Sequence, residues 1–270
     1  MPVIELFPKS GQTREISGLY LAHRLHTLGS AETPLVYANF VQSLDGRIAA
    51  NGKLPESLAN ASDFRLFLEL QAQADCLITH GGYSRAVAEG QLDDVLQVGI
   101  TEQTRDLKEW RAKQGLPPQP TVVVASASLD FPLPQSLATH AQRVFIATGY
   151  AADKERVLSW ERKGYEVLRA GPQREVEGAP LIAALARLGF KSIYLVAGPL
   201  MLATMLRDRV LSRLYLTISH QILGGENFHT LFRGEKLEAP AQFELRSLHY
   251  DSAKPQSFAQ FDCCHTVQRA

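Results

Sequence analysis

The stretch from Leu35 to Ala49, LVYANFVQSLDGRIA, constrains the fold of this chain more than any other. It opens with an apolar run, which is typical of a strand buried on both faces of a parallel sheet. Ser43 and Asp45 then follow, and the pair Asp45-Gly46 favours a tight turn because glycine adopts positive φ freely. Strands of α/β sheets offer side chains to a ligand at such ends, although a capped turn without any ligand has the same pattern.

The composition narrows the class of protein. The chain has 270 residues, enough for one large domain or two small ones, and its 45% hydrophobic and 21% charged residues are typical of soluble globular proteins. It carries 28 basic and 28 acidic residues, so charge gives no reason to expect nucleic acid or an anionic membrane surface as a partner.

The lack of a targeting signal and the spacing of the cysteines favour the cytoplasm. No apolar run reaches the length of a membrane span, and the N-terminus lacks the pattern of a secretory signal. The three cysteines, Cys76, Cys263 and Cys264, lack C-x-x-C spacing, which argues against a disulfide framework and a zinc site. We therefore expect a cytoplasmic protein without a bound metal.

Apolar runs alternate with helical patterns at the length of βαβ units, which predicts a largely parallel sheet. We treat residues 1–34 as an N-terminal arm with a short amphipathic helix at 16–28, and residues 35–270 as the main domain. In the main domain we expect strands at 76–79, 121–125, 143–147, 165–169 and 214–219, an antiparallel pair at 243–250 and 257–267, and helices at 62–74, 101–113, 153–163 and 179–188. Ser62 is the predicted N-cap of the first of these helices, with Phe64, Phe67 and Leu68 facing inward.

The segment SLDGRIA (43–49) resembles the SLDG(K/R)IA signature of the riboflavin-biosynthesis reductase domain, a family with the dihydrofolate-reductase fold. The resemblance extends from about Leu35 to the C-terminus. ADCLITHGGYS is similar to the family's (A/S)DAILVG-x-x-T, YLVAGPL to LVEGGPTL, LYLTIS to LYLTIAP and ILGG to LLGG. It implies an α/β, dihydrofolate-reductase-like fold with a mixed, mostly parallel sheet flanked by helices, a C-terminal antiparallel hairpin, and a homodimer.

The resemblance also implies an activity and a site. The activity is NADPH-dependent reduction of a pyrimidine or pteridine substrate, most similar to that of 5-amino-6-(5-phosphoribosylamino)uracil reductase. Asn39, Ser43 and Asp45 are the implied substrate residues, and Asp45 would bond a ribose hydroxyl or help to deliver the proton that accompanies the hydride. The implied cofactor residues are Thr79, Gly81, Gly82, Ser126, Thr148, Ala197, Gly198, Leu200, Gly224 and Gly225.

Two of these cofactor features have their own local signal. Residues 80–82 are predicted to form a glycine turn between a strand and a helix, where N–H groups can meet a phosphate, although a plain turn looks the same. Ser126 and Thr148 end successive predicted strands, so their hydroxyl groups are expected along one sheet edge. Arg85 is one candidate for contact with a 2′-phosphate.

Among the departures from the family pattern, three bear on activity and keep other functions open. His80 and Ala197 replace glycines at the cofactor, and Val196 replaces a glutamate. The zinc motif of the companion deaminase is not in the sequence. The alternatives are a ligand-binding protein of the same fold without catalysis and a structural partner subunit; stabilisation by NADPH or NADH distinguishes them from a reductase.

Overall fold

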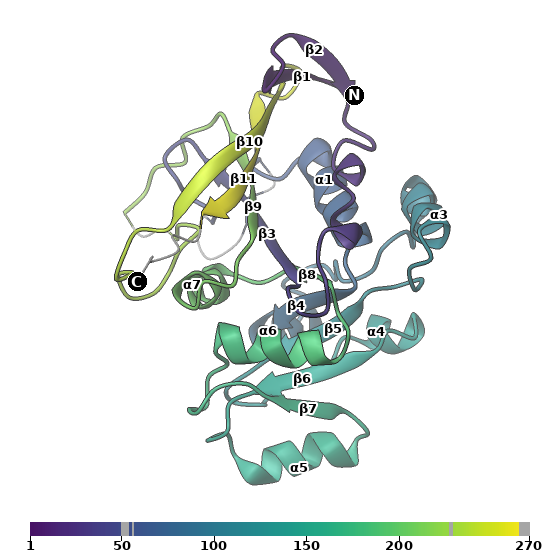
Figure 1. Cartoon of the computed structure of the whole chain (residues 1–270), viewed down its shortest axis with the longest axis vertical. Coiled ribbons are helices and arrows are strands. Elements are labelled where there is room, and N and C mark those ends of the chain that lie inside the picture. Colours follow the sequence, from purple (N-terminus) through teal and green to yellow (C-terminus); the bar gives the residue numbers. More distant parts are fainter. Residues whose placement is uncertain (50–53, 56, 227–228, 265–270) are drawn as a thin grey trace. The chain divides into compact units, whose positions relative to one another are not determined.

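Most strands form where the sequence has short apolar runs, and the strands fall into two units of the chain. The computed structural model describes residues 1–49, 54–55, 57–226 and 229–264. The first unit contains Met1–His23, Val36–Glu69 and the residues from Gly198 on, and the second contains Arg24–Leu35 and Leu70–Ala197. Figure 1 labels the elements of both units.

The second unit is built on five parallel strands in the order β8-β4-β5-β6-β7. They are β4 (Cys76–His80), β5 (Thr121–Ala125), β6 (Val144–Thr148), β7 (Glu166–Arg169) and β8 (Ser192–Leu195). The central strands β4, β5, β6 and β8 are almost entirely buried, as their continuous apolar sequences require in a parallel sheet. The helices of this unit are η2 (Leu25–Thr27), α2 (Gly81–Ala88), η3 (Glu102–Thr104), α3 (Arg105–Lys113), α4 (Gln135–Thr139), α5 (Lys154–Arg162) and α6 (Gly178–Arg187).

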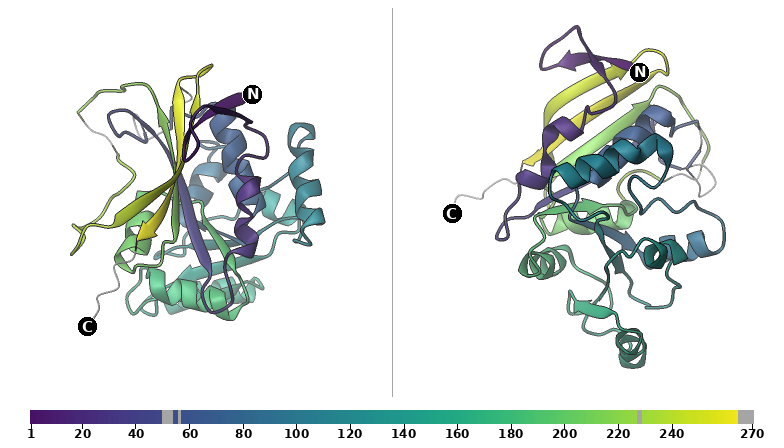
Figure 2. Two further views of the ribbon diagram at one scale, coloured as in Figure 1. Left: turned by 45° about the horizontal axis from the view of Figure 1, so that its top comes forward. Right: turned by 90° about the vertical axis from the view of Figure 1, so that its right-hand side faces the viewer.

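The first unit contains six strands in the order β2-β1-β10-β11-β9-β3. They are β1 (Pro2–Phe7), β2 (Gln12–Glu15), β3 (Leu35–Ser43), β9 (Arg213–Ser219), β10 (Gln242–Asp251) and β11 (Gln256–Cys264). β3 and β9 are parallel, and the other neighbours in this order are antiparallel. The views in Figure 2 show β10 and β11, in yellow, side by side. The helices are η1 (Leu21–His23), α1 (Ala61–Ala72), whose last turn belongs to the second unit, and α7 (Pro199–Arg207).

This architecture confirms the expected fold class, a mixed and mostly parallel sheet with flanking helices and a C-terminal antiparallel pair. The predicted strands from 76 to 219 are present, with ends that differ by at most one residue, and so are the helices predicted at 153–163 and 179–188. The helix predicted at 101–113 divides into the short η3 and α3.

The predicted helix at residues 16–28 is wrong. The segment forms two single 3₁₀ turns, η1 and η2, separated by Arg24 in a left-handed conformation with φ 50°. Some of its backbone donors bond to side chains instead of carbonyls one turn back: Tyr20 N–H donates to Glu69 (2.9 Å) and Leu25 N–H to Gln73 (2.8 Å). The spacing of the leucines therefore predicted an amphipathic helix that does not form.

The start of α1 also differs from the prediction. Asn60, not Ser62, caps the helix, because Asn60 Oδ1 accepts hydrogen bonds from the N–H groups of Ser62 (2.9 Å) and Asp63 (3.2 Å). Phe64, predicted to face inward, is 47% exposed, and the buried leucines of α1 are Leu66, Leu68 and Leu70.

Neither a membrane-spanning helix nor a metal-binding group of side chains is found in the described part of the chain. Among the residues that the structure describes, no helix is long and apolar enough to cross a membrane. Within the same residues, no group of three or more His, Cys, Asp or Glu side chains lies close enough together to hold a metal ion.

Candidate active site

The turn after β3 places Asp45 at the end of a buried strand, as predicted. The backbone closes through hydrogen bonds from Gly46 N–H to the Ser43 carbonyl (3.0 Å) and from Ser43 N–H to the Arg47 carbonyl (3.0 Å). Gly46 has a φ of 77°, which glycine adopts without steric cost. Asn39 lies on the same face of β3 as Ser43, because alternate residues of a strand share a face.

The Asp45 carboxylate is fully engaged by the protein itself. It accepts hydrogen bonds from Ser43 Oγ (2.5 Å), Arg47 Nε (2.7 Å) and the N–H groups of Leu223 (3.2 Å) and Gly224 (2.9 Å). A carboxylate has about four acceptor positions, so these donors occupy them. The turn is thereby attached to the glycine loop around Gly224, which lies 179 residues away in the sequence.

Arg47 completes this cluster, and the sequence analysis did not select it. Its Nη2 donates to the Gly225 carbonyl (2.6 Å), and Gly225 has a left-handed φ of 100°. The position of Arg47, two residues after Asp45 in SLDGR, is the signal that points to it. We call the group of Ser43, Asp45, Arg47 and residues 223–225 the Asp45 cluster.

Hydrogen bonding holds the pKa of the Asp45 carboxyl well below its usual range. The Ser43 hydroxyl makes the largest contribution; desolvation opposes it, and Gly224, Arg47 and Leu223 reinforce it. The carboxylate is therefore charged at neutral pH and has no proton to give. Proton delivery, one of the two roles predicted for Asp45, does not fit this charged state, and the occupied acceptor positions suit a carboxylate that holds the turn and the glycine loop in place.

In the second unit, neighbouring parallel strands end in polar residues at one edge of the sheet. His80 ends β4 and Ser126 follows β5, where its N–H donates to the Ala147 carbonyl (2.9 Å) beside Thr148 at the end of β6. The predicted alignment of these strand ends is present. Their hydroxyl groups differ, because Ser126 is half-buried whereas Thr148 is buried and donates to the Arg174 carbonyl (3.3 Å).

The predicted glycine turn after β4 is wrong, because helix α2 starts directly after His80. His80 Nδ1 accepts a hydrogen bond from Tyr83 N–H (3.2 Å) and caps the helix. The two glycines are required by packing: a Cβ on Gly81 would lie 2.8 Å from the Phe131 ring, and a Cβ on Gly82 would lie 2.9 Å from His80 Nδ1. The side chain of His80, which is larger than the glycine of the family pattern, therefore serves as the N-cap of α2.

A buried threonine and a half-buried histidine lie at the end of β4. Burial, and after it the charge of Arg85, lowers the pKa of His80, so its imidazole is neutral at pH 7, as its acceptor role requires. Thr79 is buried, and its hydroxyl has no hydrogen-bond partner among the described residues. Gly81 and Ser126 lie together, since a Cβ on Gly81 would be 3.2 Å from Ser126 Oγ.

Gly198 leaves open space at the start of α7. Pro199 occupies the first helical turn, as predicted, and Leu200 is 60% exposed. A Cβ on Gly198 would have no heavy atom within 4 Å, so a ligand has room against this backbone. Val196 and Ala197, two of the departures from the family pattern, are half-buried.

Comparison with known proteins decides the family. Residues 34–255, most of the chain, match the family described as the RibD C-terminal domain. The chain belongs to the RibD C-terminal domain family. The resemblance expected from SLDGRIA is thereby confirmed.

Two relatives of this RibD-family chain are matched over nearly all of their own length. One, from Archaeoglobus fulgidus, is 24% identical over 211 residues, which cover 78% of this chain and 91% of the relative. The other, from Aquifex aeolicus, is 26% identical over 224 residues, which cover 80% of this chain and 91% of the relative. Both are named 2,5-diamino-6-ribosylamino-4(3H)-pyrimidinone 5′-phosphate reductase.

Solved structures share the fold of the RibD-family chain. A pyrimidine reductase-like protein from Corynebacterium diphtheriae has a TM-score of 0.68 at 20% identity, covering 86% of this chain and 92% of its own. A riboflavin biosynthesis reductase from Saccharomyces cerevisiae has a TM-score of 0.57 at 13% identity, covering 92% of this chain and 99% of its own.

Proposed function

We propose that this chain is a reductase of riboflavin biosynthesis that uses NADPH to reduce a pyrimidine ribosylamino phosphate. The observation that carries the proposal is the family match over residues 34–255, together with two relatives named as reductases and matched over 91% of their length. The substrate expected from the sequence is 5-amino-6-(5-phosphoribosylamino)uracil. The names of the relatives add the corresponding diaminopyrimidinone, so both compounds are candidates.

The residues present fit a dinucleotide. α2 begins with Gly81 and Gly82 at the sheet edge beside Ser126, and a helix start of this kind favours phosphate. Taken by itself, Gly198 of the first unit leaves its backbone open to close approach. NADPH, when bound, supplies the hydride; the protein binds it and fixes its orientation.

We assign substrate binding to Asn39 and the Asp45 cluster, whose Gly224 and Gly225 are two glycines that the resemblance assigned to the cofactor. The ionised Asp45 holds Arg47 and the N–H groups of the glycine loop in fixed positions, which reduces the ordering that substrate binding would otherwise require. The proposal also includes a homodimeric state and a location in the cytoplasm. The three unbridged cysteines fit a reducing compartment, and sedimentation equilibrium would test the dimer.

The proposal is tested by following the loss of reduced nicotinamide with each candidate pyrimidine. We expect turnover with at least one of them, and stabilisation of the protein by NADPH alone. Binding of NADPH without turnover on either compound would favour a ligand-binding protein of this fold, with Val196 as the position to examine. Failure to bind either NADPH or NADH would overturn the reductase.

A further inference from the structure

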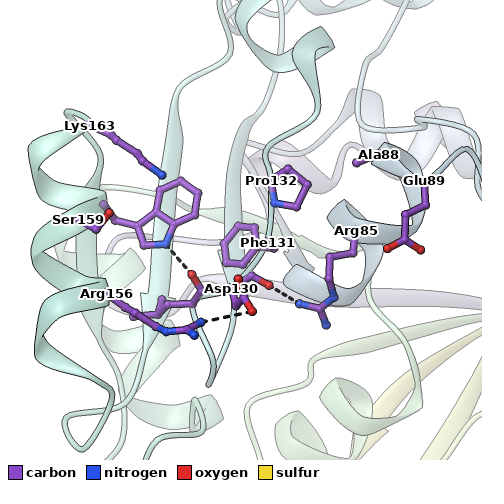
Figure 3. A pocket seen from close by; sticks show the side chains of 11 residues that line it. Arg85, Ala88, Glu89, Asp130, Phe131, Pro132, Arg156, Ser159 and Lys163 are labelled. Atoms are coloured by element: carbon purple, nitrogen blue, oxygen red, sulfur yellow. Dashed lines mark hydrogen bonds and ion pairs between the residues drawn. The ribbon is translucent and has the colours of Figure 1, made fainter.

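Each unit of the chain contains a groove. The groove of the second unit has a volume of about 470 Å³ and is lined in part by Arg85 and Ala88 of α2 (Figure 3). It therefore shares a helix with the glycine pair already proposed for the dinucleotide. The groove of the first unit contains none of the predicted substrate or cofactor residues, and it is the one considered below.

This second groove lies between the end of α7, the loop at 235–241 and the end of β11. It consists of two hollows, of about 230 Å³ and about 50 Å³, and we call it the α7 groove. The residues that line both hollows are Leu206, Arg209, Leu237 and Ala239. Because the two hollows share these residues, one small molecule can contact both.

β11 brings two cysteines to the smaller hollow. Cys263 and Cys264 line it, and Cys264 pairs with Gln242 of β10, so the thiols lie beside the loop that leads into β10. Cys264 is exposed, whereas Cys263 is half-buried and Cys76 is fully buried elsewhere in the chain. Burial, and after it the charge of Cys264, raises the pKa of Cys263 to about 11, so Cys263 stays a thiol at neutral pH. Since the thiolate is the nucleophile, Cys264 is the cysteine open to exchange.

The larger hollow adds charges that the protein does not pair. Arg207, Arg209 and Lys236 are exposed, and their side chains make no hydrogen bond or ion pair with any described residue. The same holds for Glu235 and Glu238. The α7 groove therefore presents three positive and two negative charges, with an exposed thiol at one end.

This combination of charges fits an acidic peptide that carries a sulfur atom. A γ-glutamyl tripeptide of the glutathione type has two carboxylates, one ammonium group and one cysteine sulfur. Its carboxylates suit Arg207, Arg209 and Lys236, because charge-assisted hydrogen bonds to arginine and lysine are among the strongest that a carboxylate makes. Leu206 and Leu237 give its methylene groups an apolar surface.

We propose that the α7 groove binds an acidic peptide disulfide of the glutathione type and that Cys264 forms a mixed disulfide with it. The Cys264 thiolate attacks one sulfur of the disulfide, so that a new S–S bond forms as the original S–S bond breaks. The other half leaves as a thiolate and takes up the proton that Cys264 has lost. Cys264 is thereby oxidised and half of the peptide disulfide is reduced, and excess reduced peptide reverses the exchange.

The first test locates the adduct. The full chain is incubated with millimolar glutathione disulfide, and its peptides are analysed by mass spectrometry. We expect one glutathione adduct, at Cys264, that Cys264→Ser removes and Cys263→Ser leaves in place. A wild-type chain without an adduct, or an adduct at Cys263 that persists in Cys264→Ser, would overturn the proposal. Neither result depends on reductase activity.

The second test examines the role of the charges in the α7 groove. Exchange rates are measured with dithiobis(nitrobenzoate), which carries two negative charges, and with uncharged dithiodipyridine. We expect Arg209→Ala to slow the charged reagent roughly fivefold at low ionic strength and to leave the uncharged one unchanged. Arg233→Ala is the matched control, because Arg233 is an exposed arginine of the same loop that does not line the groove.

A third comparison tests the selection of the peptide. Wild type should react faster with glutathione disulfide than with cystamine, a disulfide of two cations, and Arg209→Ala should narrow this difference. Equal rates with the two disulfides, or equal slowing of the charged and uncharged reagents by Arg209→Ala, would show that Cys264 reacts without help from the groove and would overturn the binding site.

Discussion

At the scale of single residues, Asp45 works as a fully bonded anion. Its carboxylate is half-buried and holds the strand turn to the glycine loop through Arg47 and the N–H groups of Leu223 and Gly224. An amide in its place keeps the size but removes the charge and turns one acceptor into a donor. The arrangement therefore depends on ionised Asp45 and not merely on its shape.

Asp45→Asn is accordingly expected to lower kcat/KM for the pyrimidine roughly 10- to 100-fold, the range for loss of a hydrogen bond to a charged group. Arg47→Ala should have a similar effect, and the double variant should be little worse than either single one, because the two residues form one unit. Steady-state kinetics measure this, with Glu226→Gln, an exposed change in the same loop, as the control. Unaltered turnover by Asp45→Asn would show that the cluster does not serve the substrate.

The residue types at this site could be predicted, but their pairing could not. The turn at Asp45-Gly46 and the pair Gly224-Gly225 are visible as local signals, because each depends on nearby backbone geometry. Their attachment to each other depends on contacts across 179 residues, which no local pattern contains. His80 illustrates the converse, since a residue that looked like an obstruction caps the helix that follows it.

At the scale of elements, α1 anchors the N-terminal segment through one buried carboxylate. Glu69 has no exposed surface and accepts hydrogen bonds from the N–H groups of Gly18 (2.5 Å), Tyr20 (2.9 Å) and Leu21 (3.3 Å). Arg65, one turn earlier, donates to it at 2.8 Å. The sequence could not show this, because the apolar spacing at residues 16–28 favours a helix while the actual partners of the backbone lie on α1.

Glu69→Ala should therefore lower the free energy of unfolding by about 3–5 kcal/mol, since it leaves Arg65 and three N–H groups without their buried partner. Urea denaturation measures the loss, and hydrogen exchange at Tyr20 and Leu21 should rise with it. Glu155→Ala, an exposed change on α5, is the control and should cost less than about 0.5 kcal/mol. Equal effects of the two substitutions would contradict the anchoring role.

At the scale of the whole molecule, the parallel part of the fold was the more predictable. Its strands are buried on both faces, so each appears as a short apolar run bounded by turn residues. The hairpin of β1 and β2 was missed, because β2 (QTRE) is fully exposed and has no apolar period; its pairing with β1 alone defines it. Strands specified by pairing instead of burial leave little trace in a single sequence.

Global stability should depend on pH through two groups of the first unit, the half-buried His23 and the buried Asp63. Burial lowers the pKa of His23 to about 4, and the positive charges of Arg213 and His249 lower it further. The unfolded chain therefore takes up a proton at His23 before the folded protein does, so stability is lost as the pH falls from about 6.5 towards 4. Burial raises the pKa of Asp63 to about 6, against a smaller opposing hydrogen bond from Thr217. Asp63 is neutral in the folded protein at low pH, so its effect has the opposite sign, and stability is lost as the pH rises from about 4 to 6.

Asp63→Asn isolates the second effect, because asparagine is nearly the same size and does not titrate. The shift from 3.8 to about 6 corresponds to about 3 kcal/mol, so the variant should gain about that much relative to wild type between pH 4 and pH 7. Urea denaturation of both proteins at several pH values measures this difference, and Glu235→Gln, an exposed change, serves as the control. With the Asp63 contribution removed, the stability of the variant should rise more steeply with pH than that of wild type, as the His23 contribution requires. A difference between the two proteins that stays constant with pH would mean that Asp63 is charged in the folded state, and that a partner other than Thr217 stabilises its carboxylate.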